Sequence, residues 1–76
     1  DDVKQTKIQI YPNPAKAIVN VKTDDLIKSI EIYDSLGRII KSEVSKTLNI
    51  TELDKGIYFL KVKTASGESI EKIIKE

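Results

Sequence analysis

The sequence contains no cysteine, no histidine, no methionine and no tryptophan. Without cysteine the chain forms neither a disulfide bond nor a thiolate metal site, so this residue type leaves the redox compartment open. Without histidine it lacks the commonest general base and the commonest metal ligand. Because the chain starts at Asp1 rather than at an initiator methionine, we expect it to be a piece of a longer protein.

Charge of one sign and long hydrophobic runs are also lacking. The 13 lysines and arginines are balanced by 12 acids, which leaves a formal net charge of +1. Nucleic acids and anionic membranes select a basic surplus, so we expect neither as a partner. The apolar runs are far shorter than the ~20 residues of a membrane-spanning helix, so no stable membrane insertion is expected.

Isoleucine and valine far outnumber alanine and leucine, and this bias indicates the fold class. Branching at Cβ favours extended backbone over helix. Short apolar stretches recur every eight to twelve residues or so, and turn residues separate them, as in sandwiches and barrels. A chain of 76 residues forms one small domain. We therefore predict an all-β protein, a compact Ig-like antiparallel β-sandwich of about seven short strands.

Period-two alternation locates the strands and their buried faces. The expected strands cover residues 7–11, 17–23, 27–34, 38–44, 47–50, 57–64 and 68–75. The expected inward side chains of the second strand are Ala17, Val19 and Val21. Near-complete burial is predicted for Ile30, Ile32, Leu60 and Val62.

The last strand is open to a second interpretation. Its isoleucines Ile70, Ile73 and Ile74 also fit the i, i+3, i+4 spacing of a helix. The turn sequence Ala65-Ser66-Gly67 directly before it is a hairpin signal, and we therefore predict a strand.

No constellation of catalytic or metal-binding residues is found. The acidic pairs at residues 1–2 and 24–25 are adjacent, and neighbouring strand residues point to opposite faces. Each pair offers too few oxygens for the usual calcium shell of six to eight, so a solvated turn is expected. The serines have no histidine to activate them, and the isolated glycines form no phosphate loop. We therefore expect no enzyme activity and no cofactor.

The four aromatic residues suggest one binding alternative. A sugar-binding strip would consist of Tyr11, Tyr33, Tyr58 and Phe59. Aromatic side chains spread over three strands more often pack a core, and we favour this interpretation. For Tyr58 we expect a buried ring with its hydroxyl in water.

Four segments, taken in order, resemble a known family. They are YPNPA at 11–15 followed by VNV at 19–21, IYDSLGR at 32–38, GIYFLKV at 56–62 and EKIIK at 71–75. Their order, their spacing and their end at the chain terminus resemble the C-terminal sorting domain of the type IX (Por) secretion system of Bacteroidetes. The resemblance covers residues 8–76 and implies that the motif positions are Pro12, Asn13, Pro14, Asp34, Gly37, Arg38, Gly56, Tyr58 and Lys61.

These motif residues also have structural roles. The prolines end the first strand, and Gly37 takes the positive φ of a tight turn. We expect Arg38 to pair with Asp34 across that turn. The terminal strand is expected to have one open sheet edge, with Lys72 and Lys75 deterring casual pairing.

The resemblance implies a function for the whole domain. Residues 1–6 are then the linker from an upstream cargo protein, and residues 7–76 are the sorting domain. The implied partners are the outer-membrane translocon, its cell-surface signal peptidase and the N-terminally fused cargo. The cargo passes through the periplasm and ends on the outer-membrane surface or is secreted, usually after the domain is cleaved off. The residues implied to contact the translocon are Lys72, Ile73, Ile74, Lys75 and Glu76.

The alternative function is a structural or adhesive Ig-like module of a large extracellular protein, with carbohydrate as one ligand class. A sorting domain is the last element of its precursor, whereas an adhesive module lies anywhere in the chain and often repeats.

Overall fold

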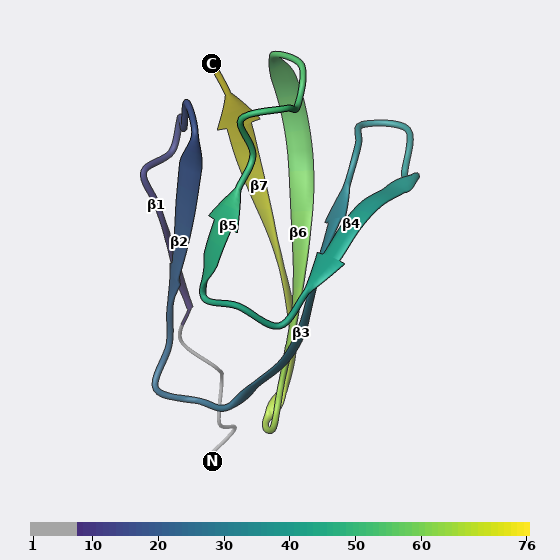
Figure 1. Ribbon diagram of the computed structural model, residues 1–76. Coiled ribbons are helices and arrows are strands. Elements are labelled where there is room, and N and C mark those ends of the chain that lie inside the picture. Colours follow the sequence, from purple (N-terminus) through teal and green to yellow (C-terminus); the bar gives the residue numbers. More distant parts are fainter. Residues whose placement is uncertain (1–7) are drawn as a thin grey trace.

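Two antiparallel sheets pack face to face in the computed structural model, which describes residues 8–76 (Figure 1). The strands are β1 (Gln9–Tyr11), β2 (Ile18–Lys22), β3 (Ile27–Tyr33), β4 (Ile39–Glu43), β5 (Thr47–Asn49), β6 (Gly56–Thr64) and β7 (Gly67–Lys75). The smaller sheet has the order β1-β2-β5, and the larger one has the order β4-β3-β6-β7. The predicted all-β, Ig-like antiparallel sandwich of seven strands is confirmed. Lys7 and the expected 1–6 linker lie outside the described residues.

The last strand decides between the two interpretations of the terminal isoleucines. Residues 67–75 form a strand and not a helix, and all nine residues of β7 pair with β6 in an unbroken antiparallel register. The resulting hairpin extends along the whole sandwich, with β6 in green and β7 in yellow (Figure 1). Among the described residues, no helix is long and apolar enough to cross a membrane.

The core lies between the sheets and follows the period-two pattern. The four predicted core residues are all buried, with exposed fractions of 0% for Ile30, Leu60 and Val62 and 1% for Ile32. The other sheet contributes Val19, Val21 and Leu48 to the same cluster. Burial of these β-branched and leucine side chains is the main force that holds the two sheets together.

One inward prediction in the second strand is wrong. Ala17 is exposed, and the buried alanine in this region is Ala15. The alternation starts only at Ile18, because the backbone bends at residues 16 and 17 before β2 begins. The carbonyl of Ala17 accepts a hydrogen bond from the Ile50 amide at 2.7 Å, which fixes this bend against the end of β5.

The turn at residues 24–25 is more than a solvated loop. The Asp25 carboxylate accepts a hydrogen bond from the Ser66 amide at 3.2 Å, across 41 residues of sequence. Hydrogen bonding to Ser66 lowers the pKa of the Asp25 carboxyl below its ordinary value. This contact ties the β2–β3 turn to the tip of the β6–β7 hairpin.

Candidate functional site

The motif residues between β3 and β4 build a self-contained turn. Asp34 accepts hydrogen bonds on Oδ1 from the amides of Leu36 and Arg38, each at 2.9 Å. Its Oδ2 accepts from Arg38 Nε at 2.8 Å, so the predicted Asp34–Arg38 pair is confirmed. The hydrogen bond from the Arg38 amide is the main cause that lowers the pKa of the Asp34 carboxyl. Gly37 completes the turn with a φ of 85°, which side chains with Cβ rarely adopt.

The motif residue Tyr58 is part of the core. Its side chain points inward from β6 and is 7% exposed. The expected burial of the ring is thus observed, and the hydroxyl donates a hydrogen bond to the Asp54 carbonyl at 2.7 Å, a protein partner that the sequence did not predict. The acceptor belongs to the loop before β6, only four residues away in sequence.

The motif residues 12–15 form a loop that binds the last strand. Asn13 Nδ2 donates to the Lys72 carbonyl, and the Ile74 amide donates to Asn13 Oδ1, both at 3.0 Å. Ala15 continues the contact, because its amide donates to the Ile74 carbonyl and its carbonyl accepts from the Glu76 amide, both at 2.8 Å. The Asn13 side-chain amide thus bonds to β7 as a backbone amide of a neighbouring strand would.

These four hydrogen bonds correct the expected open edge. β7 is an edge strand of the larger sheet, as predicted, but its terminal part is covered by Asn13 and Ala15. We call these two residues the edge clamp. The clamp occupies the outward backbone groups from the Lys72 carbonyl to the Glu76 amide.

The five terminal residues expected to contact a translocon divide between the two faces of β7. Ile73 is 0% exposed and Lys75 is 9% exposed, because both point toward the smaller sheet. Lys75 therefore does not deter pairing at the surface, and its Nζ donates to the Glu76 carbonyl at 2.9 Å. Lys72, Ile74 and Glu76 are exposed, and Ile74 lies directly opposite Ile57 of β6 on the outer face.

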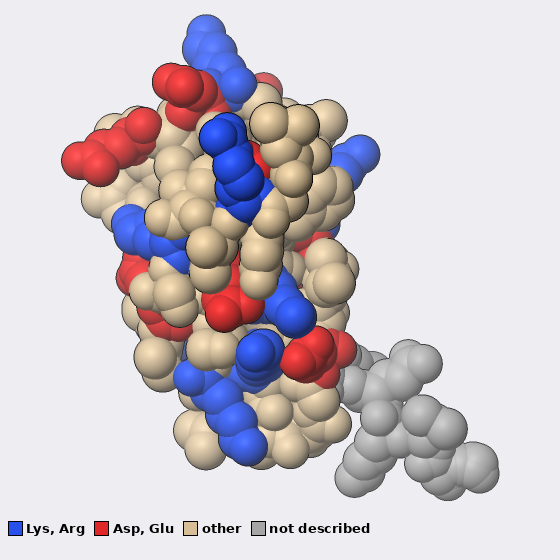
Figure 2. Space-filling view, turned by 90° about the vertical axis from the view of Figure 1, so that its right-hand side faces the viewer, with Lys and Arg blue, Asp and Glu red and all other residues tan. Residues whose placement is uncertain are grey.

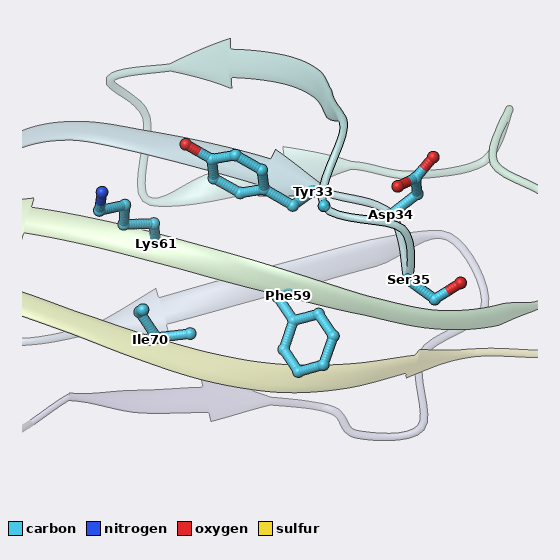
Figure 3. Close-up of a pocket in the computed structure, with 7 residues that line it drawn as sticks. Tyr33, Asp34, Ser35, Phe59, Lys61 and Ile70 are labelled. Atoms are coloured by element: carbon cyan, nitrogen blue, oxygen red, sulfur yellow. The ribbon is translucent and has the colours of Figure 1, made fainter.

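The outer face of the larger sheet also carries a shallow apolar pocket of about 360 Å³. Tyr33, Phe59 and Ile70 line it from three neighbouring strands, as Figure 3 shows. Tyr33 and Phe59 are direct cross-strand partners, and Lys61 is opposite Ile70. The Tyr33 hydroxyl donates to Glu31 Oε1 at 2.8 Å, and this hydrogen bond raises the pKa of Tyr33.

The four aromatic residues do not form a continuous sugar-binding strip. Tyr58 points into the core and Tyr11 belongs to the smaller sheet, so only two of the four aromatics come together. Sequence reasoning missed Ile70 as a member of this surface. The signal for it was parity, since Ile70 and Ile74 are separated by four residues on one strand and share a face.

Charges are mixed over the surface rather than gathered by sign. In the view of Figure 2, blue cations and red acids alternate on the face turned to the reader. Among residues 8–76, no group of three acids is placed to hold a metal ion. The surface features of the described residues are thus an edge strand, a clamped terminus and a shallow apolar pocket on a small β-sandwich.

Comparison of the chain with known proteins identifies its family. Residues 9–76 match the model of the secretion system C-terminal sorting domain, so the chain belongs to this family. The predicted relationship to the type IX sorting domain is confirmed, and the chain is a C-terminal sorting signal of type IX secretion. Such a domain is a signal on cargo proteins and is not itself catalytic, and it implies export through the outer membrane to the cell surface or the medium.

Two curated relatives come from Zobellia galactanivorans. The chain is 30% identical to beta-agarase D over 70 residues, and the matched region covers 90% of this chain and 14% of that protein. It is 34% identical to beta-agarase A over 80 residues, and this matched region covers 97% of this chain and 14% of that protein. The chain therefore spans about one seventh of the length of the relatives it matches.

Proposed function

We propose that the exposed side chains of the terminal strand are what the type IX translocon reads. Of the five candidate residues, Lys72, Ile74 and Glu76 present their side chains to a receptor. Ile73 and Lys75 contribute indirectly, because their burial holds the strand in one register. The observation that carries this proposal is the edge clamp, which fixes the terminal strand in place and leaves its outer face accessible.

Membership in the family supports the remaining steps of the proposed pathway. The domain is fused to the C-terminal side of a cargo protein, with residues 1–6 as the linker and residues 7–76 as the sorting domain. The cargo crosses the periplasm, is passed through the outer-membrane translocon, and is separated from the domain by the cell-surface signal peptidase. The fragment itself has no enzyme activity in this scheme.

A portability experiment tests the function. Residues 1–76 are fused behind an unrelated periplasmic reporter and expressed in a host with the secretion system and in a matched host without the translocon. Reporter at the surface of the first host alone supports the sorting function. Equal surface signal in both hosts, or none in either, contradicts it.

A charge reversal tests the reading of the terminal strand. Lys72→Glu changes an exposed side chain and leaves the apolar pattern of β7 intact, so stability should change by about 0.5 kcal/mol or less. The matched control is Lys22→Glu, which changes an exposed lysine on β2 of the other sheet. Export that falls for Lys72→Glu and not for the control supports reading of the outer face. Export that survives in both shows that Lys72 is not read.

The Tyr33–Phe59 pair supports a second candidate function, the adhesive module that binds carbohydrate. Flat aromatic faces beside an open apolar pocket suit the faces of sugar rings. The names of the relatives suggest agarose oligosaccharides as the first ligands to titrate. Chemical-shift changes at Phe59 that saturate with such a sugar support this function, and their absence at millimolar sugar contradicts it.

A further inference from the structure

The part of the β7 edge before the clamp has outward backbone groups without a hydrogen-bond partner among the described residues outside β7. The clamp bonds to the carbonyl of Lys72, to both backbone groups of Ile74 and to the amide of Glu76. Even-numbered residues of β7 therefore direct their backbone groups away from β6. By period two, the amides and carbonyls of Glu68 and Ile70 point the same way, together with the Lys72 amide. No described residue outside β7 bonds to these groups.

This open edge segment, residues 68–72, has a defined length. At one end it stops at the β6–β7 turn, where the chain reverses at Ala65 and Ser66. At the other end it stops at Asn13, whose amide occupies the edge between the Lys72 carbonyl and the Ile74 amide. An extended peptide that joined the sheet here would pair with about five residues.

The side chains along the open edge segment have a distinct order on the outer face. An acid, an apolar residue and a base follow one another at Glu68, Ile70 and Lys72. Ile70 is 64% exposed and borders the pocket with Phe59. The complementary order on a neighbouring antiparallel strand is a base opposite Glu68, an apolar residue opposite Ile70 and an acid opposite Lys72.

We propose that the secretion partner adds one antiparallel strand to β7 at residues 68–72, with this complementary order of side chains. The proposal rests on the proposed function, because the open edge segment is continuous with the terminal residues assigned to the translocon and shares Lys72 with them. Main-chain hydrogen bonds supply the affinity and the side chains opposite Glu68, Ile70 and Lys72 supply the selectivity, as in other strand additions. The edge clamp sets the point where the added strand must leave the sheet.

A second copy of the chain suits this edge less well than a partner segment. Two open edge segments centred on Ile70 would match acid to base, but β7 continues into its hairpin. Each copy would then place Gly67 opposite residue 73 of the other, where Asn13 of that other copy already lies. A segment of a different protein is free to turn away at this point.

A single proline substitution tests the main-chain contact. Ile70→Pro removes an outward amide without breaking a bond to β6, and proline is tolerated at such edge positions. Ile70→Thr is the matched control, because it loses the apolar side chain and keeps the amide. We expect Ile70→Pro to weaken binding to the purified, detergent-solubilised secretion complex by about 2–10-fold beyond Ile70→Thr, from the loss of one main-chain hydrogen bond. Equal losses in the two variants overturn strand addition.

Hydrogen exchange of the unchanged domain gives a second measurement that needs no variant. Strand addition protects the amides of Glu68, Ile70 and Lys72 when the secretion complex is bound, while the clamped Ile74 amide is slow with and without it. Unchanged exchange at residues 68–72 in the bound state overturns the proposal, even if Ile70→Pro fails to fold. An export-competent domain with this result would still be a sorting signal, whereas failure of the portability experiment removes the proposed function itself.

Self-association is tested in the same samples by sedimentation at millimolar concentration. A monomer in the wild type supports a partner segment as the occupant. A dimer that Ile70→Pro abolishes overturns this choice in favour of a second copy.

Discussion

The turn at residues 34–38 and the loop at residues 12–15 hold equally prominent motif residues, yet they work over different distances. Each hydrogen bond of the turn joins residues no more than four apart in sequence. The two side-chain bonds of Asn13 reach across 59 and 61 residues to β7. The first motif shapes its own segment, whereas the second closes the domain by joining its first turn to its last strand. Substitutions in the two motifs should therefore change amide exchange in different parts of the domain.

The largest effect is expected where both motifs depend on the same core. Leu60→Ala removes a fully buried side chain of β6 and should lower the free energy of unfolding by about 2–5 kcal/mol. Denaturant unfolding with a melting curve measures the loss. A loss below about 1 kcal/mol would show that the site collapses around the cavity, and the two motifs would then not share one rigid core.

Asn13→Ala breaks the long-range motif alone. It removes two side-chain hydrogen bonds and should cost about 1–3 kcal/mol, at about 0.5–1.5 kcal/mol for each bond. Amide exchange should accelerate at Ile74 and remain unchanged at Leu36 in the other motif. Asn20→Ala is the control, because its single bond to Tyr11 is long at 3.4 Å. Faster exchange at both motifs would mean that they are coupled.

Gly37→Ala breaks the local motif alone. Alanine meets no atom within 4 Å there, so the cost is the positive φ itself, about 1 kcal/mol. The expected signature is a lower melting temperature with unchanged exchange at Ile74. Increased exchange at Ile74 would contradict the idea that the turn acts only on its own segment.

The smallest effect is expected from the charge of Asp34. Because hydrogen bonding to the Arg38 amide lowers the pKa of this carboxyl below its ordinary value of 3.8, the stability it contributes is complete above that pH. This contribution is lost as the pH falls through the lowered pKa of the folded state. Melting temperatures of the wild type and of Asp34→Asn should therefore differ at neutral pH and converge below pH 3.8. A difference that persists in acid would assign the effect to shape instead of charge.

The same contrast explains what the sequence was able to predict. Period two identified the seven strands and the four central core residues, because alternation on a half-buried sheet is a local property. The Asp34–Arg38 pair was also predictable, because the two residues are only four apart in sequence and their contact is local. The partners of Asn13 were not, because the pairing depends on which sheet edge the first loop reaches, and this is decided by the topology of the whole domain.

The wrong prediction for Lys75 on the terminal strand has a physical origin in the register of the strand. Ile73 and Ile74 are adjacent, so one of them must face outward, and the apolar pattern does not say which. The register with β6 decides the matter, since it places Ile73 opposite the inward Tyr58 and takes Lys75 to the same face. The buried lysine follows from this register, whereas the covered edge follows from the position of the first loop beside β7.

The position of Asn13 directly before Pro14 has a consequence for the chemical ageing of the domain. Asparagine deamidates when the backbone nitrogen of the next residue attacks the side-chain carbonyl and closes a succinimide ring. Proline has no N–H, so Pro14 does not support this cyclisation. The amide therefore resists conversion into a carboxylate, which would lose its donor to the Lys72 carbonyl. The hydrogen-bond donor of the edge clamp is thus preserved over time by the chemistry of the residue that follows it.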